Sequence, residues 1–357
     1  MNANFWKNRR VFITGHTGFK GGWTSLWLSS LGAKVYGYSL PPPTSPSFFL
    51  ITKLHKKISN SFFGNIINLK NLTRAISIAK PSIIIHMAAQ SLVRESYKAP
   101  VNTFMTNAIG TINVFEASRQ IKTVKAIINV TSDKCYENKE KYIKTYREND
   151  RLGGYDPYSS SKACSEIITN AYRESFLNSA KTYVASARAG NVIGGGDWAS
   201  DRLIPDFFRA LNSNKILRIR FPGAIRPWQH VLEPISGYLN LAEKLFKYGK
   251  KYAESWNFGP NERDTKSVHQ ILRYLSSKFK TSNFKIENKL QLHESKFLKL
   301  NSSKAKFRLS WNSKWNTEVA LNKTIEWYQA WKNNEDMFSY SIYQIHSYEK
   351  FNKKKII

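Results

Sequence analysis

A glycine-rich loop near the N-terminus places the strongest constraint on what this chain can fold into. Arg10–Thr14 has the apolar character of a strand, Gly18–Leu31 has a helical pattern, and glycines stand at positions 15, 18 and 21. Glycines at this spacing let the backbone turn tightly and let a pyrophosphate approach the amides at the helix N-terminus. The loop therefore predicts a dinucleotide-binding strand–loop–helix unit, with an ordinary glycine-rich turn as the alternative.

Short apolar runs alternate with helical patterns along the first 190 residues. We expect strands at 10–14, 33–38, 82–86, 125–131 and 183–187, and helices at 18–31, 69–79, 100–119 and 157–176. Strands separated by helices of this length form βαβ units and a parallel sheet. The predicted fold class is α/β, a Rossmann-type doubly wound parallel sheet with a smaller mixed C-terminal substrate lobe.

The character of the sequence changes after Gly190. A glycine turn at 194–196, a basic aromatic segment at 225–231 and a helical pattern near 234–248 follow. We expect a dinucleotide-binding domain over 1–190, a second lobe over 191–331 that is interleaved with it, and a polar C-terminal tail over 332–357.

The net charge of +30 raises the question of an anionic partner. Such a balance can indicate nucleic acid, an acidic membrane surface or an anionic substrate, and it can also reflect lysine spread along the whole chain. Because no Lys/Arg stripe is interleaved with aromatics, we expect no nucleic-acid partner. No stretch reaches the roughly 18 apolar residues of a membrane span. The two cysteines, Cys135 and Cys164, form no metal cluster, so we expect no metal and a cytoplasmic location.

A Tyr-x-x-x-Lys pattern is the strongest catalytic signal. Tyr158 and Lys162 stand one helical turn apart and face the same side. A lysine ammonium beside the tyrosine, together with an oxidised nicotinamide, would favour the tyrosine phenolate, which can then act as a base on a substrate hydroxyl. The pattern is common in helices and gains weight from the glycine loop and from Ser132, which ends the strand at 125–131.

Asp133 and Lys134 follow Ser132 directly and admit two interpretations. They can form a solvent-exposed ion pair of little energetic weight, or they can act as an acid and a base. The second role requires burial to raise the pKa of the aspartate and lower that of the lysine. One internal proton transfer interconverts the charged pair and the neutral pair, so the proton count permits either state.

Together these segments resemble a known family. The chain resembles the extended short-chain dehydrogenases/reductases that act on nucleotide sugars, and within that group most closely the CDP-glucose 4,6-dehydratases. The matching stretches are TGHTGFKGGW (14–23), HMAAQSLVR (86–94), TSDKCY (131–136), GGYDPYSSSK (153–162), ARAGNVIGGGDWASDRLIP (187–205), IRPWQHVLEP (225–234) and WNFGP (256–260).

The resemblance implies a lyase that converts CDP-glucose to CDP-4-dehydro-6-deoxyglucose. Bound NAD would take the C4 hydride while Tyr158 takes the hydroxyl proton, water would leave across C5 and C6, and the hydride would return to C6. Asp133 would be the acid and Lys134 the C5 base. The alternative is a 4,6-dehydratase or an epimerase acting on another nucleotide sugar. The resemblance also implies deoxysugar synthesis for bacterial surface polysaccharide, and a homodimer formed through the helices at 100–119 and 157–176.

The resemblance further assigns residues to each role. The catalytic residues are Ser132, Asp133, Lys134, Tyr158 and Lys162. Besides Tyr158 and Lys162, the NAD-binding residues are Gly15, His16, Thr17, Gly18, Phe19, Lys20, Gly21, Asn65, Ile66, Ala88, Ala89, Gln90 and Asn107. The residues that bind the nucleotide sugar are Gln90, Asn191, Arg202, Leu203 and Arg226.

Three of these assignments carry alternatives. Strand two ends at Tyr38-Ser39-Leu40 without an acidic residue for the ribose, and His16 and Lys20 add polar and basic groups to the loop, so the choice between NAD and NADP stays open. Asn65 stands where relatives often carry an aspartate facing the adenine. Asn107 suits a structural role and a functional role equally well.

Overall fold

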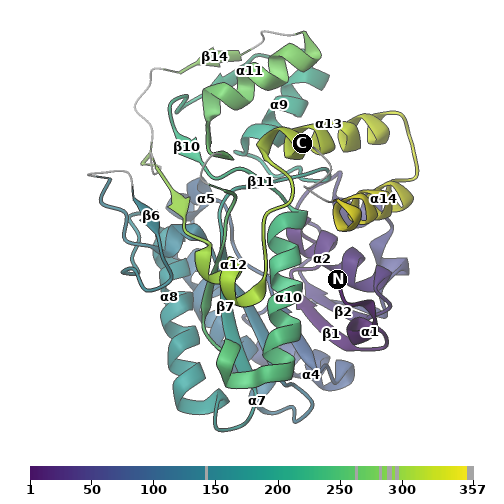
Figure 1. Ribbon diagram of the computed structural model, residues 1–357, viewed down its shortest axis with the longest axis vertical. Coiled ribbons are helices and arrows are strands. Elements are labelled where there is room, and N and C mark those ends of the chain that lie inside the picture. The colour runs from purple at the N-terminus through teal and green to yellow at the C-terminus, as the bar shows by residue number, and fades with distance from the viewer. Residues whose placement is uncertain (141–143, 262–263, 281–283, 288–291, 294–296, 352–357) are drawn as a thin grey trace.

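A parallel sheet forms the centre of the molecule (Figure 1). The computed structural model describes residues 1–140, 144–261, 264–280, 284–287, 292–293 and 297–351. Within these ranges, seven parallel strands pair in the order β12-β7-β5-β4-β1-β2-β3. Their bounds are β1 Arg10–Thr14, β2 Lys34–Ser39, β3 Asn60–Phe63, β4 Ile83–His86, β5 Ala126–Val130, β7 Tyr183–Ala189 and β12 Ser255–Phe258. The strand order reverses beside β1, which confirms the predicted Rossmann-type doubly wound sheet.

Helices cover both faces of this sheet, and the strands are apolar on both sides for that reason. In β1, Val11 and Ile13 enter one core while Phe12 enters the other. The first core contains side chains of α2 Phe19–Ser30 and α10 Leu232–Tyr248. The second contains those of α4 Leu69–Ala79 and α7 Gly110–Arg119.

The predicted helices at 100–119 and 157–176 are each interrupted. The first divides into α6 Pro100–Phe104, a π-helical turn at Met105–Ile109 and α7. The second is α8 Pro157–Tyr172, followed by a π-helical turn at Arg173–Leu177. Asp156 caps α8 by accepting a hydrogen bond from the Ser159 amide at 2.9 Å, which fixes the start of the helix that carries Tyr158.

The second lobe lies at the opposite end of the molecule from α4 and α7 (Figure 1). It contains α9 Leu203–Asn212, α11 Val268–Phe279, and the strand pairs β9 Leu217–Ile219 with β14 Phe284–Ile286 and β10 Ile225–Arg226 with β13 Lys266–Ser267. Between these segments the chain returns to the sheet through α10 and β12, so the two lobes are interleaved along the sequence.

Residues 333–351 correct the sequence prediction of a polar tail over 332–357, whose last six residues lie outside the described part of the chain. Met337–Lys350 form helix α14, which packs beside α13 Thr317–Lys332 and α2. The Tyr348 hydroxyl donates to Glu233 at 2.7 Å, and the Tyr348 ring lies edge-on to Trp27 and Trp315. The buried face of α14 includes Ser341 and Gln344, and these polar residues conceal its helical period in the sequence.

The remaining elements are short. The strands β3 and β12 were missed from the sequence, because four residues carry little periodic signal. The other short elements are α1 Ala3–Trp6, α3 Phe48–Ile51, α5 Val93–Lys98, α12 Ser303–Leu309, β6 Thr145–Tyr146 with β15 Lys299–Leu300, and β8 Val192–Ile193 with β11 Gln229–His230. Among the described residues, no helix combines the length and the apolar character that crossing a membrane requires.

Candidate active site

The predicted site residues converge where parallel strands end on the same edge of the sheet. The glycine loop follows β1, the His86–Gln90 segment begins at the last residue of β4, Ser132–Lys134 follow β5, and Asn191 follows β7. In a doubly wound sheet this edge, near the strand-order reversal, is where ligands bind. Helix α8 lies beside the segment after β5 and brings Tyr158 and Lys162 to it.

The glycine loop is shaped so that its backbone faces outward at the start of α2. Gly15 has a φ of +81°, and a Cβ there would lie 2.8 Å from the Ala88 amide nitrogen. A Cβ on Gly21 would lie 2.0 Å from the Gly15 carbonyl oxygen. Gly18 is the N-cap of α2 and provides no side chain to the helix amides, which are left for an anion.

The side chains of His16 and Thr17 are held in hydrogen bonds with β3 and with the end of β2. His16 is buried against Gly37, and its Nε2 lies 2.7 Å from the Ser61 hydroxyl. Burial lowers the pKa of His16 to about 4, so the ring is neutral and adds no positive charge to the loop, contrary to the sequence prediction. Thr17 lies 2.7 Å from the Ser39 hydroxyl and donates to the Leu40 carbonyl. Both residues therefore offer a cofactor their backbone.

Lys20 differs from its neighbours because its ammonium interacts with the charges of Asp133 and Lys162. Burial, together with the positive charges of Lys162 and Arg202, lowers the pKa of Lys20 to about 8, and the Asp133 carboxylate opposes the change. Phe19, one residue earlier, lies against Gly194. The sequence placed Lys20 in the cofactor loop and gave no sign that its side chain extends to Asp133.

The other predicted cofactor residues divide into exposed and structural positions. Asn65 is exposed and its side chain accepts from the Ile67 amide, while Ile66 is buried against Gly110. Ala88 and Ala89 are half-buried beside the glycine loop, where Thr14 accepts hydrogen bonds from the Met87 and Ala88 amides.

Gln90 and Asn107 are tied into the scaffold. The Gln90 side chain bonds within its own loop, accepting from the Leu92 amide at 2.5 Å and donating to Thr103 at 2.9 Å. Asn107 is buried; it donates to the Gln90 carbonyl and the Ser161 hydroxyl and accepts from the Gln90 amide. These contacts favour the structural alternative for Asn107, and they leave the Gln90 side chain little capacity for a ligand.

Ser132, Asp133, Tyr158 and Lys162 form a buried cluster. The Ser132 hydroxyl donates to Asp133 at 3.1 Å and accepts from the Lys134 amide at 3.2 Å. Burial raises the pKa of Tyr158 to about 12, while a hydrogen bond with Ser132 and the charge of Arg202 oppose that rise. Lys162 donates to the Val130 carbonyl at 3.5 Å, and burial lowers its pKa to about 8.

The Asp133 carboxyl is only 2% exposed, so the interpretation of a solvated surface pair is wrong for this residue. Burial raises its pKa to about 6, even though Lys134, Arg226 and Lys20 favour the charged form. Its Oδ2 has no hydrogen-bond partner within the described parts of the chain. Lys134 is half-buried, and its ammonium interacts with this carboxyl.

Two arginines approach the cluster from the second lobe. Arg226 is buried, and its positive charge lowers the pKa of Asp133. Arg202 is half-buried and donates to Asp197 at 2.8 Å and to Ser91 at 3.0 Å. Leu203 begins α9 beside it, and the Asn191 carbonyl accepts from the Gln229 amide at 3.2 Å.

Sequence reasoning missed two groups close to this cluster. Tyr238 of α10 is fully buried, its charge would interact with Asp133 and Tyr158, and no pattern singles it out. Glu166 is buried under the cluster and pairs with Arg188. A signal existed for Glu166, because Tyr158, Lys162 and Glu166 recur every four residues along one helix.

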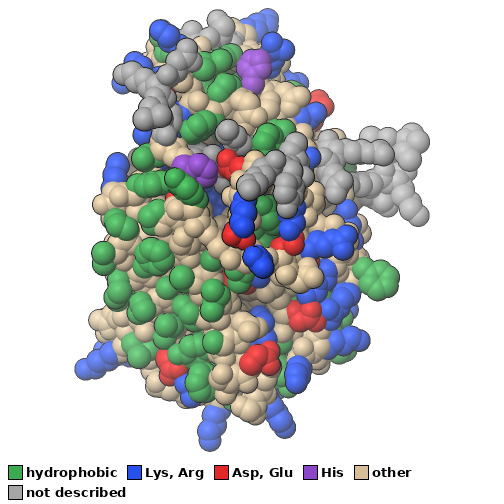
Figure 2. Space-filling model, turned by 90° about the vertical axis from the view of Figure 1, so that its left-hand side faces the viewer, with side chains coloured by type: hydrophobic (Ala, Val, Ile, Leu, Met, Phe, Trp, Pro, Cys, Tyr) green, Lys and Arg blue, Asp and Glu red, His purple; other side chains and the backbone are tan. Residues whose placement is uncertain are grey.

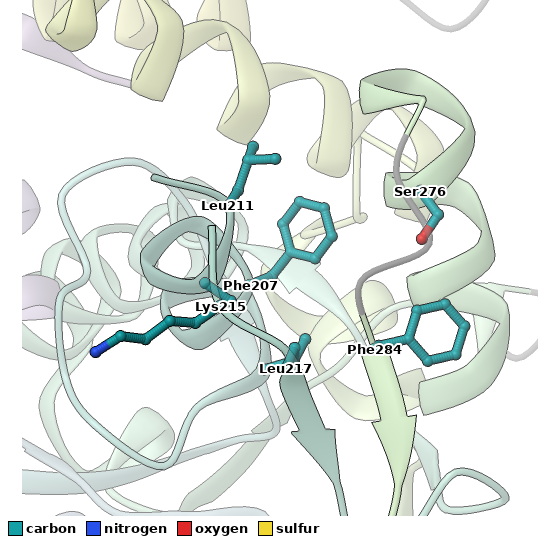
Figure 3. Close-up of a pocket in the computed structure, with 7 residues that line it drawn as sticks. Phe207, Leu211, Lys215, Leu217, Ser276 and Phe284 are labelled. Carbon is teal, nitrogen blue, oxygen red and sulfur yellow. The ribbon is translucent and has the colours of Figure 1, made fainter. Parts of the chain in front are cut away.

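The pocket in Figure 3 lies apart from these residues. It is an apolar recess in the second lobe, lined by Phe207, Ala210, Leu211, Lys215, Leu217, Ser276 and Phe284. The Lys215 side chain points away from the labelled aromatic rings, so the recess presents no charged group to a ligand (Figure 3).

This fold and this cluster define a short-chain dehydrogenase/reductase of the extended type. Residues 12–324 match the family model described as GDP-mannose 4,6 dehydratase, and the chain belongs to that family. It is 46% identical over 354 residues to the CDP-glucose 4,6-dehydratase of Salmonella typhimurium, covering 98% of each chain. These matches confirm the predicted resemblance and the class of enzyme, a nucleotide-sugar 4,6-dehydratase.

Solved structures support the fold. The dTDP-glucose 4,6-dehydratase of Bacillus anthracis in complex with NAD superposes with a TM-score of 0.76 at 22% identity, over 92% of this chain and 99% of that one. A dTDP-glucose 4,6-dehydratase from Streptomyces venezuelae with NAD bound gives a TM-score of 0.78 at 18% identity, with the same coverage.

The raised pKa of Asp133 has a consequence for stability. Between about pH 4 and 6 the folded carboxyl keeps a proton that the unfolded chain has released, so its ionisation destabilises the fold as pH rises. We therefore expect Asp133→Asn to gain about 3 kcal/mol of unfolding free energy relative to wild type between pH 4 and 7. Urea denaturation at a series of pH values measures this difference.

Asp150 provides the matched control. Lys144 and the Arg147 amide hold its pKa below the usual value against the opposing effect of burial. Asp150→Asn should therefore lose stability relative to wild type as pH rises, which is the opposite trend. If the free energies of unfolding of Asp133→Asn and wild type differed by the same amount from pH 4 to 7, the raised pKa of Asp133 would be contradicted.

Proposed function

We propose that the protein dehydrates CDP-glucose to CDP-4-dehydro-6-deoxyglucose with NAD as a bound cofactor. The observation that carries this proposal is the buried Ser132–Lys134 segment beside Tyr158 and Lys162, because it places an acid next to an oxidation site. The 46% identity to a CDP-glucose 4,6-dehydratase over nearly the whole chain supports the choice of nucleotide.

The residues after β1 suit NAD. The concavity formed by Gly15, Gly18 and Gly21 admits backbone but no Cβ at two of its three glycines, and it opens at the uncapped N-terminus of α2. That arrangement matches a pyrophosphate held by amides. When bound, NAD would supply the acceptor for the C4 hydride and its donor to C6. Ser39 lies at the end of β2, where an acidic residue would bind the ribose, and its hydroxyl already bonds to Thr17. The adenosine ribose would therefore be bound by other residues.

Positive charge in the site suits the diphosphate and the sugar. Arg202 and Arg226 come from the second lobe, and arginine provides a planar set of donors for phosphate oxygens. Asn191 and Leu203 lie on the same segments and would contact the rest of the nucleotide sugar. Gln90 would contribute through its loop, because its side chain is engaged there.

Tyr158 would take the proton of the C4 hydroxyl. Its hydroxyl is buried and bonds with Ser132, and an ionised Tyr158 needs further positive charge nearby, because its pKa is raised to about 12, chiefly by burial. Lys162 would supply one such charge while it remains protonated. Ser132 would orient the substrate hydroxyl through the same hydrogen-bonded chain.

Asp133 and Lys134 would complete the elimination of water. With a pKa of about 6, Asp133 holds a proton in about a tenth of molecules at pH 7 and can donate it to the departing C6 hydroxyl. Lys134, when neutral, would remove the C5 proton that the 4-keto group has acidified. An epimerase has no need of this pair, which argues against that alternative.

The substrate assignment can be tested directly. Purified protein is incubated with CDP-glucose, dTDP-glucose, GDP-mannose or UDP-glucose, with and without NAD. We expect a 4-keto product, detected by its alkaline absorbance, from CDP-glucose at the highest kcat/KM. Preference for another of the four would overturn the nucleotide assignment, and turnover of none would overturn the function.

The role of Lys134 can be separated from that of Tyr158. Lys134→Met should retain oxidation at C4 but lose exchange of the C5 hydrogen with deuterated solvent, with kcat lowered by about 10²–10⁴-fold as for a lost acid–base group. Mass spectrometry of the product measures the exchange. Lys139→Met is the control, since Lys139 is exposed and its ammonium pairs with Glu137 at 3.4 Å. Normal exchange in Lys134→Met would show that another group is the base.

We propose a homodimer through α6, α7 and α8. Large apolar side chains are exposed on α6, on α8 and on the π-helical turns that follow each of them: Val101, Met105, Ile109, Ile167 and Phe176 are between 37% and 75% exposed. Figure 2 shows hydrophobic side chains gathered over the lower part of the face that turns towards its viewer. Such a concentration is typical of an interface.

Sedimentation equilibrium tests the dimer. The chain mass is 41.1 kDa, and we expect twice that mass for the wild type. Val101→Asp with Ile167→Asp should give monomers, because each charge would be buried without a partner in the interface. Ile286→Asp, an exposed apolar position in β14 of the second lobe, is the control. A wild-type monomer would contradict the proposal.

A cytoplasmic location and a place in deoxysugar synthesis for surface polysaccharide belong to the same proposal. The two cysteines are both free, as expected for a reducing compartment. The 4-keto-6-deoxy product is a reactive ketone, so the next reaction must act at or beside that carbonyl group.

A further inference from the structure

One buried ion pair lies directly beneath the catalytic cluster and takes no part in the mechanism described above. Glu166 of α8 and Arg188 of β7 are 2.8 Å apart, and their side chains are 1% and 3% exposed. A buried ion pair is a weak source of net stability, because desolvation of two charges offsets much of their attraction. The contacts that each partner makes therefore indicate what the pair contributes.

Glu166 holds the start of the catalytic segment. Its Oε1 accepts a hydrogen bond from the Thr131 hydroxyl, and Thr131 immediately precedes Ser132 and Asp133. Its Oε2 accepts from Arg188 and from the Ser186 hydroxyl at 2.6 Å. The carboxylate is thus fully used, and it joins α8 to the ends of β5 and β7.

Arg188 holds the other end of the same segment. Its Nη1 donates to the Tyr136 hydroxyl at 2.8 Å and to the Glu148 carbonyl at 2.9 Å. The Tyr136 hydroxyl in turn donates to Asn257 at 2.8 Å. Residues 131 and 136 are therefore anchored to the two partners of one ion pair, and Ser132, Asp133 and Lys134 lie between the anchors.

Glu166 lies on the same face of α8 as Lys162 and Tyr158. Tyr158, Lys162 and Glu166 lie at i, i+4 and i+8, and all three are buried. Residues at this spacing lie above one another on one face of a helix. The carboxylate that anchors Thr131 is therefore also the acidic group one turn from Lys162.

We propose that Glu166, paired with Arg188, is a positioning residue: it fixes Ser132–Lys134 against Tyr158, and its negative charge keeps Lys162 protonated. This inference rests on the proposed function, because it assigns Tyr158 and Lys162 as the base and its cation. It adds a second group whose charge and geometry the reaction requires, although that group does not touch the substrate.

The charges around Lys162 support the electrostatic half of the proposal. Burial lowers the pKa of Lys162 to about 8, and Glu166 is the main group that opposes the change. Glu166 stays ionised, since Arg188, Ser186 and Thr131 lower its pKa to about 2 against the effect of burial. The other titratable groups that interact with Lys162 are Lys20 on α2, His86 on β4 and Cys135 after β5. Burial keeps His86 neutral and raises the pKa of the Cys135 thiol, which leaves Glu166 as the negative charge among them.

The experiment compares two variants that break different parts of the arrangement. Glu166→Gln keeps the shape of the side chain and removes its charge, whereas Thr131→Val removes one anchor and leaves the charge. We expect both to lower kcat for CDP-glucose by about 10–10²-fold with KM changed by less than about threefold, because the catalytic segment is misplaced and the sugar-binding residues are intact.

The pH profile separates the two effects. The alkaline limb of kcat reports loss of the proton shared by the Tyr158–Lys162 pair. In Glu166→Gln this limb should move to lower pH by about one unit or more, because Lys162 loses its stabilising anion. Thr131→Val and Glu166→Asp both keep the negative charge of residue 166. In these two variants the alkaline limb of kcat should stay at the wild-type pH. A merely structural role would lower activity without moving the limb.

Control and contrary outcomes complete the test. Glu174→Gln changes an exposed glutamate just after α8 and should leave kcat and the profile unchanged. Unchanged kcat and an unchanged limb in a folded Glu166→Gln protein would overturn the inference. If circular dichroism shows that Glu166→Gln does not fold, Thr131→Val and Tyr136→Phe decide the positioning role, and wild-type kcat in both overturns it. In each case the wild type must turn over CDP-glucose; failure there overturns the proposed function instead.

Discussion

Desolvation of charged side chains at the carboxyl edge of the sheet is the constraint on which the rest of the site depends. The strands are apolar on both faces, so the segments that leave them begin in a region with little water. Asp133, Lys162 and Lys20 all have pKa values displaced towards neutral pH by burial. An aspartate and a lysine in water would exchange protons far from neutrality, and the same groups here lie within the range that acid–base catalysis uses. The structure offsets part of the cost of burying Asp133 with Lys134, Ser132 and Arg226, and part of the cost of burying Lys162 with Glu166.

The two lobes contribute different things to this edge. The sheet and α8 supply the groups that would exchange protons, whereas the second lobe supplies Arg202 and Arg226, which suit an anionic substrate. The chain passes between the lobes through α10 and β12, and both lobes contribute side chains to the site. Helix α14 reinforces the arrangement from behind, because Tyr348 bonds to Glu233 at the start of α10. Helix α14, whose sequence predicts a polar tail, therefore helps to hold α10 in place.

Much of the fold follows from the sequence, and particular residues show where that reasoning ends. The glycine loop, the continuous apolar strands and the helical periods predicted the sheet and most of its helices to within a few residues. Short strands such as β3 lack enough residues for a period, and α14 buries serine and glutamine. In the site, the motifs named residues that lie together at this edge of the sheet, but they did not indicate the directions of the side chains. His16 faces the interior and is neutral, Gln90 bonds to its own loop, and Lys20 extends past the cofactor loop to Asp133.

The sequence by itself determined the chemistry available to this protein, because a strand-to-helix glycine loop, Tyr-x-x-x-Lys and Ser-Asp-Lys each require particular side chains at fixed local spacing. Local spacing is set by helix and strand geometry, which the sequence encodes within a few residues. The tertiary structure alone decided which of those side chains are desolvated and which charges oppose one another. Asp133 is 93 residues from Arg226 along the chain and Glu166 is 22 from Arg188, and only the packing of β5, β7, α8 and the second lobe brings each pair of charges together.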